Sequence, residues 1–268
     1  MSLTNTALNT ATQLIEFTVK DRIAMLTLKD SQSRNALSLK MMEAISDRLA
    51  DIAQNAEIAV LVIDAEGPVF SSGHNLKEVM SDRRQDTMLE LFTKCSEMMQ
   101  AIVNLPQPVI AKVDGIATAA GCQLVASCDL AFASKSSRFA TPGVNLGLFC
   151  STPMVALSRN VAPKHAMEML LSGDFISAED AARMGLINRA VEADDLDNTV
   201  AEFAGKIASK STHTVKTGKQ AFYKQLPMDL KDAYELTSEV MASNMQSHDA
   251  AEGISAFLEK RDPEWQNK

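Results

Sequence analysis

Apolar and polar residues alternate along two adjoining segments near the start of the chain, LIEFTVKD and RIAMLTLKD. Such alternation is typical of strands that bury one face. The charged residues Lys20, Asp21 and Arg22 separate the two segments and mark a turn. We therefore expect the fold to start with an antiparallel hairpin.

A helix and a repeated strand–loop–helix pattern follow the hairpin. Ser38 is placed to cap a helix that runs to about Gln54. Apolar residues recur along it at the spacing of one helical face: Met42, Ile45, Leu49 and Ile52. The strand-like AVLVIDA, a glycine-bearing loop and a helix from about Thr87 to Val103 come next, and the strand-like QPVIAKV follows. Because the order repeats, we expect stacked α/β turns rather than a simple sandwich.

The pattern becomes helical after Ile176, with almost no strand between the helices. Five segments have the apolar spacing of amphipathic helices: SAEDAARMGL, DDLDNTVAEFAGKIAS, HTVKTGKQAFYKQL, LKDAYELTSEVMASN and AAEGISAFLEKR. We therefore divide the chain into a disordered N-terminal segment, 1–13, an α/β core, 14–205, and a C-terminal helical oligomerisation region, 206–268. Apolar helix faces end against a core or another subunit, so we expect an oligomer.

Composition limits the partners of this chain. Its 268 residues include 26 basic and 34 acidic side chains, a net charge of -8, and no basic stripe interleaves with aromatics, so nucleic acid is not an expected partner. The four cysteines show no CxxC spacing, which predicts reduced, buried thiols and no metal: Cys95, Cys122, Cys128 and Cys150.

The first dozen residues are polar and lack both the apolar stretch of a signal peptide and the arginines of a transit peptide. No segment approaches the length of a membrane span. We expect a cytoplasmic protein without a membrane partner, although a trimmed chain would hide an import signal.

The segment from Lys112 to Asp129, KVDGIATAAGCQLVASCD, ends a strand, turns through small residues and opens a helix. Glycine and alanine let the backbone approach a ligand, and the free N–H groups at a helix start suit a developing oxyanion. Chemistry on a carbonyl also needs a group that moves protons. The first polar side chain of this helix is the uncharged amide of Gln123.

Six ordered motifs in the sequence resemble the crotonase superfamily, the enoyl-CoA hydratase/isomerase family, from about Leu14 to Trp265, and most closely a divergent branch of it. They are RNALS at 34–38, FSSGHNLKEV at 70–79, PVIAKVDGIATAAGCQLVASCDLAFAS at 108–134, FATPGVNLGL at 139–148, LSGDFISAEDAARMGLINRAV at 171–191 and EGISAFLEKR at 252–261. The resemblance implies an α/β spiral of ββα units with a C-terminal helical trimerisation region. It also implies a homotrimer or dimer of trimers, a role in fatty acid metabolism, and an acyl-CoA ligand with coenzyme A as part of it and no covalent cofactor.

The resemblance assigns an oxyanion hole to the backbone N–H groups of His74 and Ala120. The two catalytic glutamates of the family fall at Gln123 and Gly143, twenty positions apart here as in the family. Glutamine is no general base at neutral pH and glycine has no side chain. We therefore expect hydration to be slower by roughly 10⁴-fold or more.

The resemblance also places residues around coenzyme A, near its adenine, pantetheine and phosphates. These are Asn35, Ala36, Leu37, Ser72, His74, Lys77, Phe257 and Lys260.

Three other side chains are candidates to replace the missing carboxylates. The imidazole of His74 titrates near neutrality, but packing away from the ligand is the favoured interpretation. Cys150 or Ser151 would offer a nucleophile, yet no adjacent base is visible. A buried thiol and a helix N-cap, respectively, are favoured for these two residues.

An alternative is that Asn145 and Gln123 together hold a water or a small anion. Asp129 is interpreted as structural. Three functions stay open: an acyl-CoA enzyme of hydratase/isomerase descent with weak or no ordinary hydratase activity, a non-catalytic acyl-CoA-binding oligomer, and a thioester hydrolase with an unusual nucleophile.

Overall fold

The computed structural model describes residues 14–268, and the predicted segment 1–13 lies outside the described residues. The predicted hairpin is confirmed: β1 (Ile15–Lys20) pairs antiparallel with β2 (Ile23–Leu28). Asp21 and Arg22 between them adopt left-handed backbone angles, with φ of 50° and 66°. Two consecutive left-handed residues give the turn whose twist matches that of paired strands.

The first long helix, α2 (Leu39–Gln54), has the predicted bounds. The Ser38 side chain accepts a hydrogen bond from the Met41 N–H at 3.2 Å, so it is the predicted N-cap. Its apolar face is buried, including Met42, Ile45, Leu49 and Ile52. The helix predicted over 87–103 is α4 (Gln85–Asn104).

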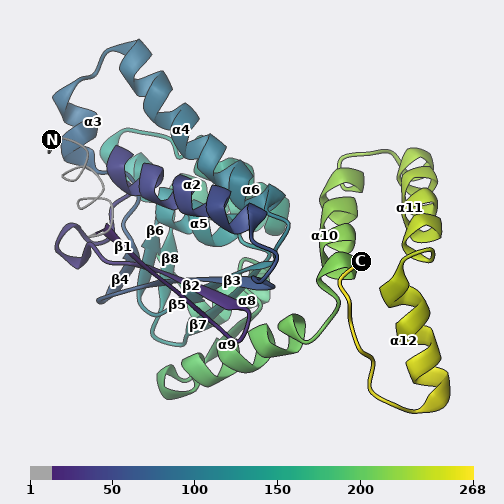
Figure 1. Ribbon diagram of the computed structural model, residues 1–268. Coiled ribbons are helices and arrows are strands. Elements are labelled where there is room, and N and C mark those ends of the chain that lie inside the picture. The colour runs from purple at the N-terminus through teal and green to yellow at the C-terminus, as the bar shows by residue number, and fades with distance from the viewer. Residues whose placement is uncertain (1–13) are drawn as a thin grey trace, which may run out of the picture.

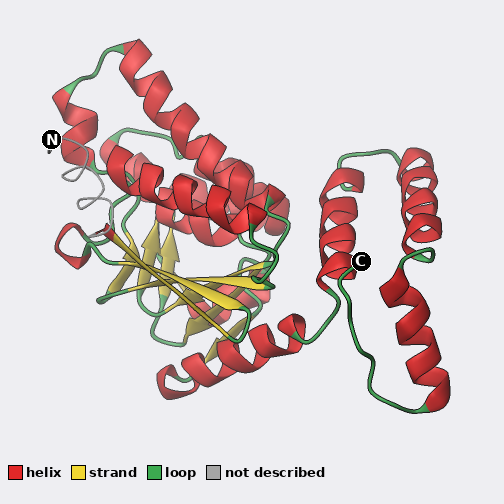
Figure 2. Cartoon of the chain, viewed as in Figure 1, coloured by secondary structure: helices red, strands yellow, loops and turns green. Residues whose placement is uncertain are grey.

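Two sheets form the core (Figure 2). The six-stranded sheet has the order β1-β2-β3-β5-β7-β10 and is parallel except for the β1–β2 pair. The four-stranded sheet has the order β4-β6-β8-β9 and is parallel except for β8–β9. The further strands are β3 (Val60–Ala65), β4 (Val69–Ser71), β5 (Val109–Val113), β6 (Ile116–Thr118), β7 (Leu130–Ser134), β8 (Arg138–Ala140), β9 (Ile176–Ser177) and β10 (Arg189–Val191). From β3 to β8 successive strands thus alternate between the two sheets, as a spiral requires.

Helices cover both faces of the six-stranded sheet. On one face α9 (Ala193–Ala208) packs against β2, β3, β5 and β7, where Val60, Val62 and Ile110 meet Leu196 and Val200. The other face joins a larger cluster with α2, α4 and α5. Burial on both faces explains why AVLVIDA is a continuous apolar run rather than an alternating one. The remaining core helices are α3 (Leu76–Ser81), α5 (Ala120–Ser127), α6 (Pro153–Asn160), α7 (Pro163–Ser172) and α8 (Ala178–Met184).

The last three helices form a separate arm (Figure 1). It consists of α10 (Thr212–Gln225), α11 (Leu230–Asn244) and α12 (His248–Glu259). The helical character predicted after Ile176 is confirmed, although the short strands β9 and β10 also lie there. Large apolar side chains are exposed along the arm: Phe222, Leu226, Leu230, Tyr234, Met241, Ile254, Phe257 and Leu258.

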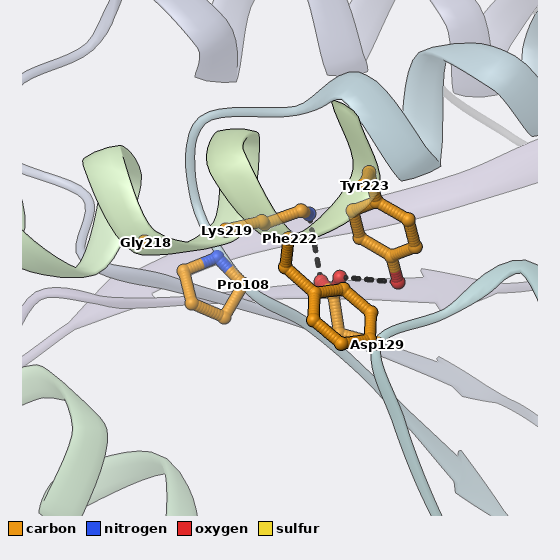
Figure 3. A pocket seen from close by; sticks show the side chains of 6 residues that line it. All are labelled: Pro108, Asp129, Gly218, Lys219, Phe222 and Tyr223. Carbon is orange, nitrogen blue, oxygen red and sulfur yellow. Dashed lines mark hydrogen bonds and ion pairs between the residues drawn. The ribbon is translucent and has the colours of Figure 1, made fainter. Parts of the chain in front are cut away.

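Asp129 ties the arm to the core (Figure 3). Its carboxylate accepts hydrogen bonds from Lys219 Nζ at 2.7 Å and from the Tyr223 hydroxyl at 2.9 Å, both on α10, and from the Val109 N–H at 2.6 Å. Burial lowers the pKa of Lys219, and the neighbouring carboxylate opposes that shift. The structural interpretation of Asp129 fits these contacts. The contacts flank a depression lined by Pro108, Asp129, Gly218, Lys219, Phe222 and Tyr223.

All four cysteines are buried and free, as predicted. Residues 14–268 contain no cluster of three or more acidic, histidine or cysteine side chains suited to a metal ion. In the same range no helix has the length and apolar character needed to cross a membrane.

Candidate functional site

Two loops meet at the start of α5. Gly73 has a φ of +85°, and a Cβ added to it would lie 3.0 Å from the backbone nitrogen of Ala120. A Cβ on Gly121 would lie 2.2 Å from the Ser71 carbonyl oxygen. The Thr118 hydroxyl donates to the Ser72 carbonyl at 3.2 Å and joins the same loops. Only glycine permits so close an approach, which brings His74 next to Ala120.

The backbone N–H groups of His74 and Ala120 donate to no acceptor within the described part of the chain. Ala120 is the first residue of α5, where helix geometry leaves the N–H unpaired. Two unpaired N–H groups from neighbouring loops can both donate to a negatively polarised oxygen. We call this pair of N–H groups the cradle.

Ala119, which precedes the cradle, has a strained backbone, with φ of 51° and ψ of -119°. This conformation is ordinarily reserved for glycine and costs about 1–3 kcal/mol. The Ala119 N–H donates to the Ala140 carbonyl and its own carbonyl accepts from the Gln123 N–H, each at 3.0 Å. The surrounding bonds thus hold the peptide that carries the Ala120 N–H in one orientation.

The imidazole of His74 packs edge-on against Phe92 of α4, with ring centroids 5.3 Å apart. Its Nδ1 lies 3.4 Å from the Leu37 carbonyl, and its buried Nε2 has no partner within residues 14–268. Burial lowers the pKa of His74, so the ring is neutral at neutral pH. These contacts agree with the favoured packing role.

Gln123 lies one helical turn after Ala120 and is only 4% exposed. Its side chain makes no hydrogen bond within the described residues, and its Oε1 is buried. The hydroxyl of Thr141, a residue 1% exposed, is unpaired in the same way. Thr141 was not predicted as a site residue, because a lone threonine before a proline carries no signal of its own.

Gly143 has no space for a side chain. A Cβ on it would lie 2.7 Å from the Leu148 carbonyl oxygen and 2.8 Å from Cys150 Sγ. The Leu148 N–H also donates to the Gly143 carbonyl at 2.9 Å, which closes the loop on itself. In this loop conformation a glutamate cannot occupy position 143 without movement of the backbone.

Cys150 is a poor candidate nucleophile because burial raises the pKa of its thiol, an effect that a hydrogen bond from the Gly143 backbone only partly offsets. Ser151 is exposed and is not the predicted helix cap, since Thr152 holds that position and makes no side-chain cap. That prediction was wrong because Pro153, which fixes the first helical residue, begins α6 two residues after Ser151. Asn145 is exposed, and its amide lies against Gly173.

The first group of predicted coenzyme A residues lies beside the cradle. Ala36 and Leu37 are buried, and the Leu37 N–H donates to the Gly73 carbonyl at 2.7 Å. Asn35 is fully buried, and its side-chain amide donates to the Glu66 carbonyl at 2.9 Å, a structural use. Ser72 lies in the cradle loop, and Lys77 is exposed on α3.

The second group lies elsewhere. Phe257 is 83% exposed on α12, and Lys260 ends that helix with a φ of 56°. Figure 1 shows α12 at the far side of the arm, away from α3 and α5. The fold of one chain therefore does not bring Phe257 and Lys260 to the cradle.

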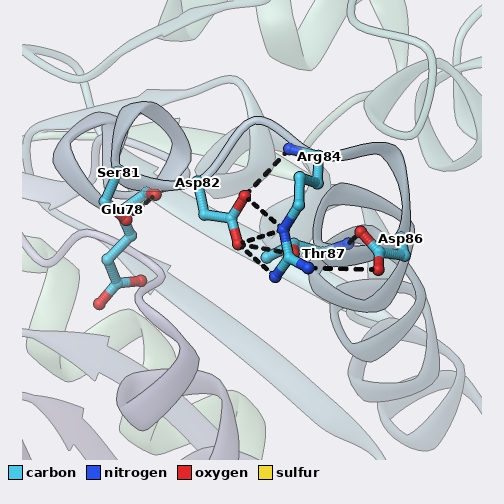
Figure 4. Close-up of polar contacts among 6 residues, drawn as sticks. All are labelled: Glu78, Ser81, Asp82, Arg84, Asp86 and Thr87. Carbon is cyan, nitrogen blue, oxygen red and sulfur yellow. Dashed lines mark hydrogen bonds and ion pairs between the residues drawn. The ribbon is translucent and has the colours of Figure 1, made fainter.

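A polar corner joins α3 to α4 (Figure 4). The Asp82 carboxylate accepts from Arg84 Nη2 at 2.7 Å and from the Thr87 hydroxyl at 2.9 Å. These contacts hold the pKa of Asp82 well below its usual range. The corner fixes the start of α4, the helix that carries Phe92 against His74.

The family model described as enoyl-CoA hydratase/isomerase matches residues 18–268. The chain belongs to this family. Its resemblance to the crotonase superfamily and its α/β spiral with a helical C-terminal region are thereby confirmed.

The divergent branch indicated by the motifs is that of enoyl-CoA hydratase domain-containing protein 3. The rat protein of that name is 51% identical over 92% of this chain and 82% of its own length. The crystal structure of the human one has a TM-score of 0.92 at 50% identity, covering 94% of this chain and all of that one. An enoyl-CoA hydratase of Mycobacterium smegmatis has a TM-score of 0.93 at 46% identity, covering 94% and 98%.

The predicted cytoplasmic location was wrong. The relatives from rat, mouse and human are all named as mitochondrial proteins, which contradicts that prediction. The prediction was based on the polar first dozen residues. An import signal is a targeting segment separate from the folded domain, so these residues do not decide the location.

Proposed function

We propose that this family member binds acyl-CoA thioesters at the cradle and polarises the thioester carbonyl, while ordinary hydratase activity is weak or absent. Each of the two donors, His74 N–H and Ala120 N–H, can contribute about 3 kcal/mol to an enolate-like oxyanion. The packing of Gly73 against Ala120 supports this half of the proposal.

The closed loop around Gly143 is the main observation that supports weak or absent hydratase activity. The Gln123 amide cannot take up a proton at neutral pH, and the contacts of Gly143 with Leu148 and Cys150 leave no space for a carboxylate. Both proton-transfer positions of the family are therefore without an acid or base, and each is ordinarily worth 10²- to 10⁴-fold, roughly.

We also propose that the protein assembles through the arm formed by α10 to α12. Phe257 and Lys260 lie away from the cradle of their own chain, so a role for them at coenzyme A requires a second copy. The exposed apolar side chains of α10 to α12 support a homotrimer or a dimer of trimers. A mitochondrial setting is proposed from the names of the relatives.

The test is calorimetric binding of crotonyl-CoA by the purified protein, with the enoyl thioester absorbance and free thiol followed alongside. We expect binding with enoyl loss slower by roughly 10⁴-fold than in a hydratase that carries both glutamates. Absence of binding would refute the proposal. Rapid loss of the enoyl signal would refute its second half, and release of free thiol would favour a hydrolase.

A matched pair of variants ties the result to the cradle. Gly73→Ala places a Cβ 3.0 Å from the Ala120 nitrogen at a φ of +85°. Gly185→Ala imposes similar strain, at a φ of +90°, where α8 ends. Only the first variant is expected to lose crotonyl-CoA binding.

A further inference from the structure

Residues 261–268 turn back from the end of α12 and run along the arm to the start of α10 (Figure 1). Lys260 begins the turn with a left-handed backbone, at a φ of 56°, and the Arg261 N–H donates to the Ala256 carbonyl at 3.0 Å. The Arg261 side chain also makes two bonds to the Glu252 carboxylate, at 2.6 and 2.9 Å. A left-handed residue at a helix end is usually glycine, so the chain keeps the Lys260 side chain where it adds strain.

This returning segment is fastened to both α12 and α10. The Asp249 carboxylate, in the first turn of α12, accepts hydrogen bonds from the N–H groups of Gln266 and Asn267, each at 2.8 Å. Asp249 is only 2% exposed. The Asn267 side chain accepts a hydrogen bond from the Thr212 N–H, at the start of α10, at 2.9 Å. Bonds from backbone N–H groups to an ionised carboxylate are among the strong ones, so Asp249 holds the segment firmly.

Trp265 packs the same segment onto α12. A Cβ added to Gly253, inside α12, would lie 3.0 and 3.2 Å from two carbons of the Trp265 ring. The Trp265 ring N–H donates to the Ser209 carbonyl, at the end of α9, at 2.9 Å. Glycine weakens a helix interior, and the close ring explains why one stands at position 253 of the motif EGISAFLEKR. We call Asp249, Gly253 and Trp265 the clasp, since their contacts fix α12 relative to α9 and α10.

The clasp matters because of the side chains that α12 presents. Phe257 is 83% exposed, and Lys260 is exposed at the end of the same helix. An aromatic face can stack on a nucleotide base, and an ammonium group pairs with a phosphate. Two such contacts add affinity only when the helix that carries them is already held in place, because ordering it on binding would consume the gain.

We propose that the clasp positions α12 so that Phe257 and Lys260 meet the nucleotide end of coenzyme A bound to a second copy of the chain. This proposal rests on the proposed cradle and the proposed assembly. Asp249, Gly253 and Trp265 are positioning residues, since they act through α12. The cradle holds the thioester end of the ligand, so a loosened clasp should weaken binding of the nucleotide end alone.

The experiment compares dissociation constants for crotonyl-CoA and for crotonyl-pantetheine, which lacks the nucleotide, in the whole chain. The parent is expected to bind crotonyl-CoA more tightly by about tenfold or more. Gly253→Ala displaces the Trp265 ring, and Asp249→Asn removes the buried charge. Each variant should weaken crotonyl-CoA binding by about five- to tenfold and leave crotonyl-pantetheine binding unchanged. Gly218→Ala is the matched control, because an added Cβ there, inside α10, meets no described atom within 4 Å.

Trp265 also reports on the clasp directly, because it is the only tryptophan in the sequence. Its fluorescence emission should shift in Gly253→Ala and stay as in the parent in Gly218→Ala. Unchanged emission in Gly253→Ala would overturn the packing of the ring on α12. Thermal melting and sedimentation are expected to show the fold and assembly of the parent in every variant.

The outcomes separate the clasp from the cradle. Equal affinity of the parent for both ligands overturns the role of α12 at the nucleotide and leaves the cradle intact. A preference for crotonyl-CoA that survives in both clasp variants overturns the clasp as its cause. Equal weakening of both ligands, or loss of assembly, would show that the clasp only stabilises the protein, which also overturns the proposal. Failure of the parent to bind either thioester overturns the cradle itself.

Discussion

Gly143 and Cys150 are packed so closely that a Cβ on Gly143 would lie 2.8 Å from Cys150 Sγ. The same Cβ would lie 2.7 Å from the Leu148 carbonyl oxygen, an atom of the backbone that no rotamer change can remove. Atoms of the loop thus lie where a side chain at position 143 would be. The lack of a carboxylate there therefore involves the packing of the loop as well as the identity of one residue.

We expect Gly143→Ala to reduce the free energy of unfolding by about 1–3 kcal/mol, the usual range for overpacking. Gly205→Ala is the control, since Gly205 lies within α9 with no atom near an added Cβ, and it should stabilise by about 0.5–1 kcal/mol. Urea denaturation of both variants measures the difference. Equal stability of the two variants would show that the loop yields easily.

The same contacts bear on attempts to restore a hydratase. A Gln123→Glu, Gly143→Glu double variant should unfold more easily than Gln123→Glu alone, and any lack of activity in it would reflect packing before chemistry. Recovery of fast crotonyl-CoA hydration requires residues 144–150 to be replaced together with Gly143. Fast hydration by the simple double variant, followed by enoyl absorbance, would contradict this view.

The strain at Ala119 gives an opposite expectation for an alanine-to-glycine change. Removing the backbone strain should raise the free energy of unfolding by about 1–3 kcal/mol. The greater flexibility of glycine in the unfolded chain should lower it by about 0.5–1 kcal/mol. Ala119→Gly is thus expected to stabilise by about 1 kcal/mol. Ala201→Gly, at an exposed position within α9, should destabilise by about 1 kcal/mol. Thermal unfolding of the pair checks the sign, and destabilisation by both variants would show that Ala119 is not strained.

The Asp129–Lys219 pair predicts how the arm is held. The two side chains are 15% and 7% exposed, so Lys219→Met leaves a carboxylate without its cation in a mostly buried place. Breaking such a pair costs about 3–5 kcal/mol. Lys29→Met breaks an exposed pair with Glu16 and should change stability little. Denaturation measures both, and limited proteolysis at α10 reports whether the arm loosens first.

The sequence predicted the elements whose signals are local. The hairpin turn at Lys20 to Arg22 and the Ser38 cap each depend on a few adjacent residues, and both appear as expected. The short strands β4, β6 and β8 were not predicted, because three residues with no alternating face carry little periodicity.

The site divides in the same way. The small residues before α5 marked the approach to a ligand, since glycine and alanine in a strand-to-helix turn have a direct physical meaning. The strained Ala119 is held by a bond to Ala140, a residue of another strand, and the buried hydroxyl of Thr141 likewise depends on how segments pack together. The closed loop of Gly143 depends on contacts with Leu148 and Cys150, which follow no regular spacing. No pattern within one segment encodes them.

The buried His74 predicts how the stability of the fold depends on pH. Burial lowers its pKa from the ordinary value of 6.5, so the unfolded chain binds a proton near that pH while the folded chain does not. Stability should therefore fall as the pH drops from about 7.5 through 6.5, because protons then favour the unfolded state. His74→Gln is expected to flatten this dependence, measured as the free energy of unfolding at several pH values. His213→Gln, which removes an imidazole from the arm, is the comparison, and an unchanged slope in His74→Gln would mean that other groups set the pH response.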